Sequence, residues 1–192
     1  MSARTTFSVV PIIHSVNKRS LIMEKNLPVR KNIRLKNYNY SSNGAYFITI
    51  CTENMCKTLG NIVGGGVLDA PRIQLSQYGE VVEKHLLAIN SHYDDLNIEK
   101  YVIMPNHVHM IILIYNEKEI GASRTPPPTR ANEYIPRFIS TLKRFVHKDC
   151  GFQLFQRGYH ERIIRNDAQY LNRWQYIDNN LVKWADDDYY VE

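Results

Sequence analysis

The chain has 192 residues, of which 44% are hydrophobic and 22% charged, and its formal net charge is +5. These values fit one soluble globular domain, and no apolar stretch reaches the roughly 18 residues that a membrane span needs. Its three cysteines do not suffice for a disulfide framework, which favours a cytoplasmic protein over a secreted one, and the expected location is the cytoplasm, in association with the nucleoid. The positive charge is compatible with a polyanionic partner.

The first segment of the chain is basic and lacks a predicted helix or strand. Residues 1–22 include Arg4, Lys18 and Arg19, no acidic residue, and no periodicity that would dock them on a core. We expect residues 1–29 to be a disordered leader, with Met23 as the natural start, and residues 30–192 to form the domain. A strongly basic stretch, residues 30–36, opens that domain.

The middle of the chain alternates predicted strands and helices. A strand is expected over residues 46–51, a flexible loop at the glycines 64–66, and a helix over residues 76–89. Two further strands follow over residues 96–104 and 107–115, and a proline-rich linker over residues 121–132.

Two histidines stand one residue apart at the start of an apolar strand. Side chains alternate along a strand, so His107 and His109 point to the same face while Val108 points to the other. Neutral imidazole is a common metal ligand, so the pair predicts a metal site. The alternative is a pair of histidines satisfied by ordinary hydrogen bonds.

A basic helix is expected after the linker. Arg137, Arg144 and Lys148 share one face, and the opposite face is apolar, with Ile135, Phe138, Leu142 and Phe145. The basic face is either a solvated surface or a surface that contacts DNA phosphates.

The last predicted helix begins at a well-specified cap. Asn166 can cap it and Gln169 occupies the reciprocal position of a capping box, so we expect a helix that runs to about Lys183. Spacings of three and four predict a buried stripe of five residues, namely Tyr170, Trp174, Ile177, Leu181 and Trp184.

Tyr176 lies about 120° away from that stripe, on a polar flank. A tyrosine phenolate can attack a phosphodiester, and a divalent metal between two histidines can polarise the phosphoryl oxygen. Asn180, one turn later, can complete the metal shell, while Arg173 and Lys183 can assist the phenol and contact DNA. The alternative is that Tyr176 is a partly exposed surface tyrosine without a chemical role.

Five ordered blocks carry a family resemblance, which runs from about residue 30 to about residue 188. They are Arg34-Leu-Lys-Asn-Tyr38, Gly44-Ala-Tyr-Phe-Ile-Thr-Ile-Cys-Thr52, Tyr101-Val-Ile-Met-Pro-Asn-His-Val-His109, Tyr159-His-Glu-Arg-Ile-Ile-Arg-Asn166 and Tyr176-Ile-Asp-Asn-Asn180. With these blocks the chain resembles the REP-associated tyrosine transposases, single-tyrosine members of the HUH superfamily. It departs from their common pattern at Phe155, Arg162 and Leu181.

The resemblance implies an α+β fold with a ferredoxin-like antiparallel sheet. It also implies a transposase and endonuclease that cleaves and rejoins single-stranded DNA beside hairpins through a 5′-phosphotyrosyl intermediate. Tyr176 would be the nucleophile, and His107, His109 and Asn180 would bind Mg²⁺ or Mn²⁺. The expected assembly is a monomer or a homodimer, without a membrane partner. Two other functions stay open: a non-catalytic single-strand-binding module and a metal-dependent nuclease that uses water.

Overall fold

The computed structural model describes residues 43–65, 69–115 and 134–191. The expected leader, the basic stretch 30–36 and the linker 121–132 lie outside these ranges. Nearly all the motifs that bear chemistry lie within them.

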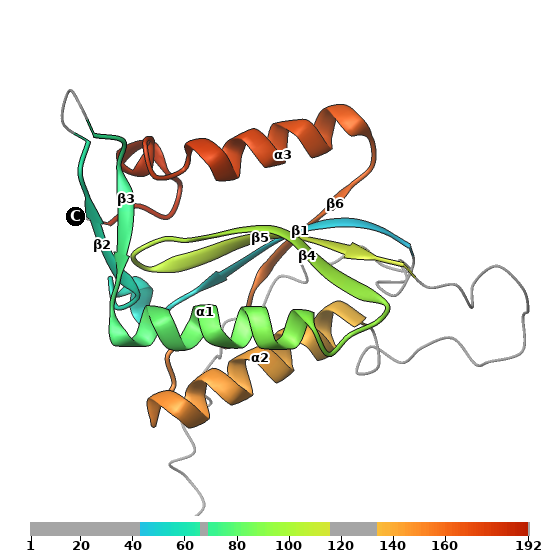
Figure 1. Cartoon of the computed structure of the whole chain (residues 1–192), viewed down its shortest axis with the longest axis horizontal. Helices are drawn as coiled ribbons and strands as arrows, with labels where there is room; N and C mark the ends of the chain where they lie inside the picture. The colour runs from blue at the N-terminus through green and yellow to red at the C-terminus, as the bar shows by residue number, and fades with distance from the viewer. Residues whose placement is uncertain (1–42, 66–68, 116–133, 192) are drawn as a thin grey trace, which may run out of the picture. The chain divides into compact units, whose positions relative to one another are not determined.

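An antiparallel four-stranded sheet forms the centre of the described fold. Its strands are β1 (Gly44–Cys51), β4 (Leu96–Ile103), β5 (His107–Ile114) and β6 (His160–Ile164), in the spatial order β4-β5-β1-β6. Helix α1 (Gln77–Asn90) connects β1 to β4, and helix α2 (Tyr134–Cys150) lies between β5 and β6 in the chain. This is the β-α-β-β-α-β order of a ferredoxin-like fold, so the predicted α+β class is confirmed (Figure 1).

Helices α1 and α2 cover one face of the sheet with an apolar core (Figure 1). Ser76 caps α1 by accepting hydrogen bonds from the amides of Tyr78 and Gly79, which fixes the predicted start of that helix. The core on this face joins alternate residues of the central strands to both helices; among them are Ile48, Val108, Met110, Val82, Leu86, Phe138 and Leu142.

Helix α3 (Asp167–Asn179) lies on the opposite face of the sheet (Figure 1). The Asn166 side chain accepts a hydrogen bond from the Gln169 amide at 2.9 Å, so the predicted cap is confirmed. The prediction that this helix continues to about Lys183 is wrong, because the chain turns after Asn179 and then forms the short helix η3 (Trp184–Asp186). Of the five predicted stripe residues, Ile177 is buried and the other four are half-buried.

A small hairpin, β2 (Gly60–Val63) and β3 (Arg72–Leu75), is inserted between β1 and α1, after the short helix η1 (Glu53–Met55). No sequence pattern predicted this hairpin. Gly79 lets α1 approach this hairpin, since a Cβ atom at this position would collide with the carbonyl oxygen of Leu59.

Two residues of α2 have environments that are unusual for their side chains. Phe145, predicted on the apolar face, is 38% exposed and stacks on His85. Lys143, in contrast, is buried, and its ammonium group donates to the carbonyl oxygens of Gln156 and Gly158, both at 2.6 Å. Both differences arise from neighbouring elements that helical periodicity does not describe.

Candidate metal and tyrosine site

The two histidines converge on the sheet face that α3 covers. Residue pairing sets His107 opposite Cys51 and His109 opposite Thr49, at the beginning of β5. Both imidazoles are almost fully buried, with 0% and 1% exposure, and their Nε2 atoms lie 2.9 Å apart. The predicted common orientation of the pair is confirmed.

Asn106 fixes the tautomer of His107. The Asn106 amide nitrogen donates to the carbonyl oxygens of Met55 and Tyr189, at 3.3 and 2.8 Å, so its amide oxygen faces His107 Nδ1 at 2.8 Å. An amide oxygen accepts only, and therefore Nδ1 carries the proton. The neutral ring then presents a lone pair at Nε2, which is the form that binds a metal.

His109 is held from β1. Its Nδ1 lies 2.7 Å from the hydroxyl of Thr49, and its ring stacks on Phe47 with centroids 5.2 Å apart. Nε2 therefore faces His107.

Burial keeps both imidazoles neutral. Burial, and secondarily the neighbouring His109, lowers the pKa of His107 to about 3. Burial also lowers the pKa of His109, although the attraction of Asp187 opposes it. Protons therefore do not compete with a cation for these nitrogens near neutral pH.

Asp187 is the acidic member of the cluster, and the sequence analysis missed it. Its carboxylate oxygens lie 4.0 Å from His107 Nε2 and 3.8 Å from His109 Nε2. One ligand atom from each of these three residues lies within 4.8 Å of the others, so the cluster can hold a metal ion. Burial raises the pKa of Asp187, but the nearby His109 imidazole and hydrogen bonds from the Tyr176 hydroxyl and the Tyr189 amide outweigh this effect and lower that pKa. The one available signal was the acidic run 186–188 just after the tyrosine helix.

Tyr176 points from α3 at this cluster. Its hydroxyl donates to Asp187 Oδ2 at 2.6 Å and lies 3.4 Å from His109 Nε2. The polar flank that carries Tyr176 thus faces the histidines, as the proposed chemistry requires. Burial, and then the Asp187 carboxylate, raises the pKa of the phenol, which is therefore protonated in this arrangement.

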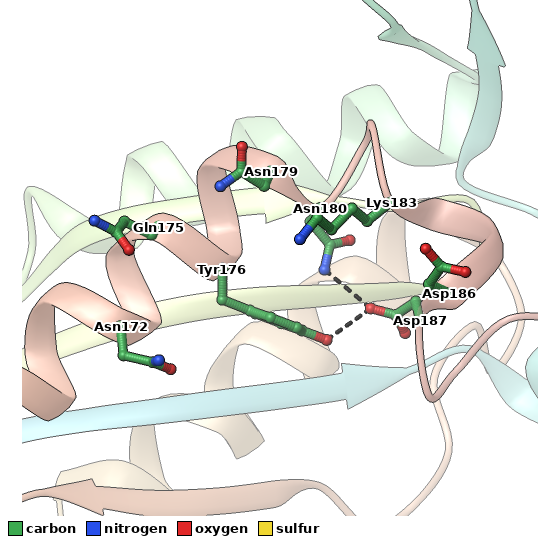
Figure 2. A pocket seen from close by; sticks show the side chains of 8 residues that line it. All are labelled: Asn172, Gln175, Tyr176, Asn179, Asn180, Lys183, Asp186 and Asp187. Carbon is green, nitrogen blue, oxygen red and sulfur yellow. Dashed lines mark hydrogen bonds between the residues drawn. The ribbon is translucent and has the colours of Figure 1, made fainter.

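Asn180, the predicted third ligand, is buried beside Asp187. Its amide nitrogen donates to Asp187 Oδ2 at 2.9 Å, and Figure 2 shows that one carboxylate oxygen receives both Asn180 and Tyr176. The amide oxygen Oδ1 is buried and has no hydrogen-bond partner among the described residues. Such an atom suits a ligand role.

Known proteins provide a comparison for this arrangement. A protein of Haemophilus influenzae, described as an uncharacterized protein, is 34% identical over 176 residues, which cover 85% of this chain and 94% of that protein. This chain belongs to the same family. No protein-family model matches it.

One solved structure identifies the fold. A REP-associated tyrosine transposase bound to a REP hairpin aligns with a TM-score of 0.54 and 17% identity, over 79% of this chain and 73% of that one. The chain has the fold of the REP-associated tyrosine transposases. A putative transposase from Deinococcus radiodurans also aligns, with a TM-score of 0.41 and 16% identity, over 76% of this chain and 97% of that one.

The transposase fold separates the predicted DNA contacts into two groups. Arg173 and Lys183 line cavities beside Tyr176. Arg137, Arg144 and Lys148 are exposed on α2, which packs on the opposite face of the sheet from the tyrosine. These three are therefore not brought to the site. In the described part of the chain, no helix combines the length and the apolar character needed to cross a membrane.

Two cavities of the transposase fold meet at Tyr176, which lines both. The larger one, of about 270 Å³, follows α3 and is rich in side-chain amides; Asn172, Gln175, Asn179 and Asn180 line it (Figure 2). The smaller one, of about 120 Å³, lies over β1 and β6 and includes His109, Arg162 and Arg173. Tyr176 thus borders a polar cavity on each of two sides.

Proposed function

We propose that this protein is a metal-dependent tyrosine transposase that cleaves and rejoins single-stranded DNA, at sites that contain hairpins. The observation that carries the proposal is the position of the Tyr176 hydroxyl, 3.4 Å from His109 Nε2 within the cluster of His107, His109 and Asp187. A nucleophile directly beside a potential metal site is the arrangement that transesterification requires.

The residues present fit a divalent ion. His107 and His109 offer two neutral imidazole nitrogens whose other ring nitrogens are already engaged. Asp187, or the buried Asn180 oxygen, would supply the oxygen ligand. Mn²⁺ and Mg²⁺ both accept such a mixed set. When bound, the ion supplies Lewis-acid polarisation of a phosphoryl oxygen.

The side chains of the site have distinct roles in the proposed reaction. The Tyr176 oxygen forms a bond to phosphorus while the bond from phosphorus to the 3′ oxygen breaks. The phenol proton has a direct acceptor in Asp187, 2.6 Å away, and the departing 3′ oxygen gains a proton to become a hydroxyl. A 3′-hydroxyl of another strand can reverse the step and join DNA, because one phosphodiester bond replaces another.

A cleavage assay with a matched tyrosine control tests this proposal. Labelled single-stranded hairpin oligonucleotides from DNA flanking the gene are incubated with Mn²⁺, with Mg²⁺ or with EDTA and separated on denaturing gels. We expect a metal-dependent covalent protein–DNA adduct that survives in Tyr170→Phe and disappears in Tyr176→Phe. Tyr170 is the control because it lies on the same helix but packs against Trp174, away from the histidines.

The other outcomes identify the competing functions. Cleavage that persists in Tyr176→Phe without an adduct would identify a nuclease that uses water. Binding without cleavage in either metal would identify a binding module.

A further inference from the structure

The smaller cavity beside Tyr176 brings two arginines together. Arg162 comes from β6, where pairing sets it opposite Phe47 on the α3 face of the sheet. Arg173 comes from α3, three residues before Tyr176, and both arginines line the cavity of about 120 Å³. His160, two residues before Arg162 and therefore on the same strand face, lines it as well.

Phe47 positions the Arg173 guanidinium. The central carbon of the group lies 5.1 Å from the centre of the Phe47 ring and 5.9 Å from the centre of the Tyr176 ring, so the guanidinium lies close to both the sheet and the nucleophile. Arg173 is half-buried, and burial together with the charge of Arg162 lowers its pKa. The half-buried charge of Arg173 thus lies near enough to the exposed charge of Arg162 to be repelled by it.

The described carboxylates do not pair with these two arginines. Among the described residues, neither arginine forms an ion pair with an acidic side chain, although Glu161 and Asp188 both line the same cavity. Glu161 pairs with Ile48 across the strands, which places its side chain on the opposite face. An anion that enters between the guanidinium groups would relieve their repulsion.

We infer that Arg162 and Arg173 form a second phosphate subsite, which binds the backbone phosphate next to the one that Tyr176 attacks. Guanidinium groups match the oxygens of a phosphate with paired hydrogen bonds. Because the cavity shares Tyr176 and His109 with the reaction site, its occupant is a close neighbour of the attacked phosphodiester. This inference rests on the proposed function, and it assigns the two arginines to positioning of the strand.

Neutral phosphate analogues test the subsite without cleavage. Binding of the hairpin oligonucleotides is measured by fluorescence anisotropy in EDTA, with one methylphosphonate linkage placed in turn at each position of the single strand. For the unaltered protein we expect one linkage beside the cleaved bond at which neutralisation weakens binding roughly tenfold. The variant with Arg162→Gln and Arg173→Gln should have lost sensitivity at that linkage.

Salt dependence and a matched arginine give the second readout. The double variant should reduce the slope of log K against log salt by roughly 0.7, the value for one phosphate contact on a single strand. Arg165→Gln is the control, since this exposed arginine follows β6 and does not line the cavity. Equal methylphosphonate profiles in the unaltered protein and the double variant would overturn the phosphate subsite. The proposed function would still stand in that case if the unaltered protein forms the covalent adduct. Absence of single-strand binding and cleavage altogether would overturn both proposals.

Discussion

The two faces of the central sheet differ although the same strands build both. On the face under α1 and α2, alternate residues such as Val108 and Met110 join a continuous apolar core. On the face under α3, their neighbours His107 and His109 join a small group of polar residues, and the buried apolar cluster there consists of Phe47, Ile111 and Ile177. The face under α1 and α2 therefore supplies most of the hydrophobic stabilisation. The face under α3 can hold buried polar groups, such as the two histidines, that do not add to this stabilisation.

The largest effect is expected on the apolar face. Phe138→Ala removes a fully buried ring of α2 and should lower the free energy of unfolding by about 3–5 kcal/mol, measured by urea denaturation. The matched control is Phe145→Ala on the same helix, which should cost far less because that ring is exposed. Equal losses of unfolding free energy in the two variants would show that burial of Phe138 against the sheet does not provide the expected stabilisation.

A metal ion should change stability through the other face. At 100 times its dissociation constant, Mn²⁺ should stabilise the protein by about 2.7 kcal/mol, a rise of roughly 5–10 °C in melting temperature. His109→Gln should remove this rise, while His85→Gln, at a histidine that pairs with Asp149, should keep it. Asp187→Asn and Asn180→Ala then identify the oxygen ligand, because only the ligand's replacement should weaken the response. A rise that persists in His109→Gln would refute the metal site.

A smaller loss of unfolding free energy is expected on acidification, because His107 is buried on the α3 face of the sheet. The pKa of His107 is about 3 in the folded protein, below its ordinary 6.5, so between these values the unfolded chain binds more protons. Stability should thus be complete above about pH 6.5 and fall on acidification towards pH 3, by at most about 1.4 kcal/mol per pH unit for this residue. Urea denaturation at pH 7 and pH 5 in EDTA should give a smaller difference in His107→Gln. An unchanged difference would contradict the buried, neutral state.

Local sequence patterns were sufficient where neighbouring residues determine the structure. Strand periodicity predicted that His107 and His109 share a face. Helix patterns predicted the start of α1 at Ser76 and the cap of α3 at Asn166, and the structure agrees in all three cases. The ferredoxin-like antiparallel sheet was expected only from the family resemblance, because pairing between distant strands leaves no local pattern.

Features that depend on distant contacts were missed. Asp187 reaches the histidines because the chain turns after Asn179, and no periodic pattern signals that turn. Lys143 is buried by carbonyl groups of the 156–158 segment, and Phe145 is exposed despite its helical position. The β2–β3 hairpin is too short to give a clear alternating pattern.

The two halves of the candidate site have unequal rigidity. The histidines lie on β5, an inner strand paired on both sides by β1 and β4, so their backbone opens only when the sheet itself is disrupted. Tyr176 lies in the last turn of α3, where the carbonyl groups of Ile177 and Asn179 accept from the amides of Asn180 and Lys183 in the following turn instead of from a continuing helix. The fold thus combines a fixed pair of imidazoles with a hydroxyl on a segment that opens at lower free energy. A side chain so placed can move relative to the imidazoles without loss of the sheet.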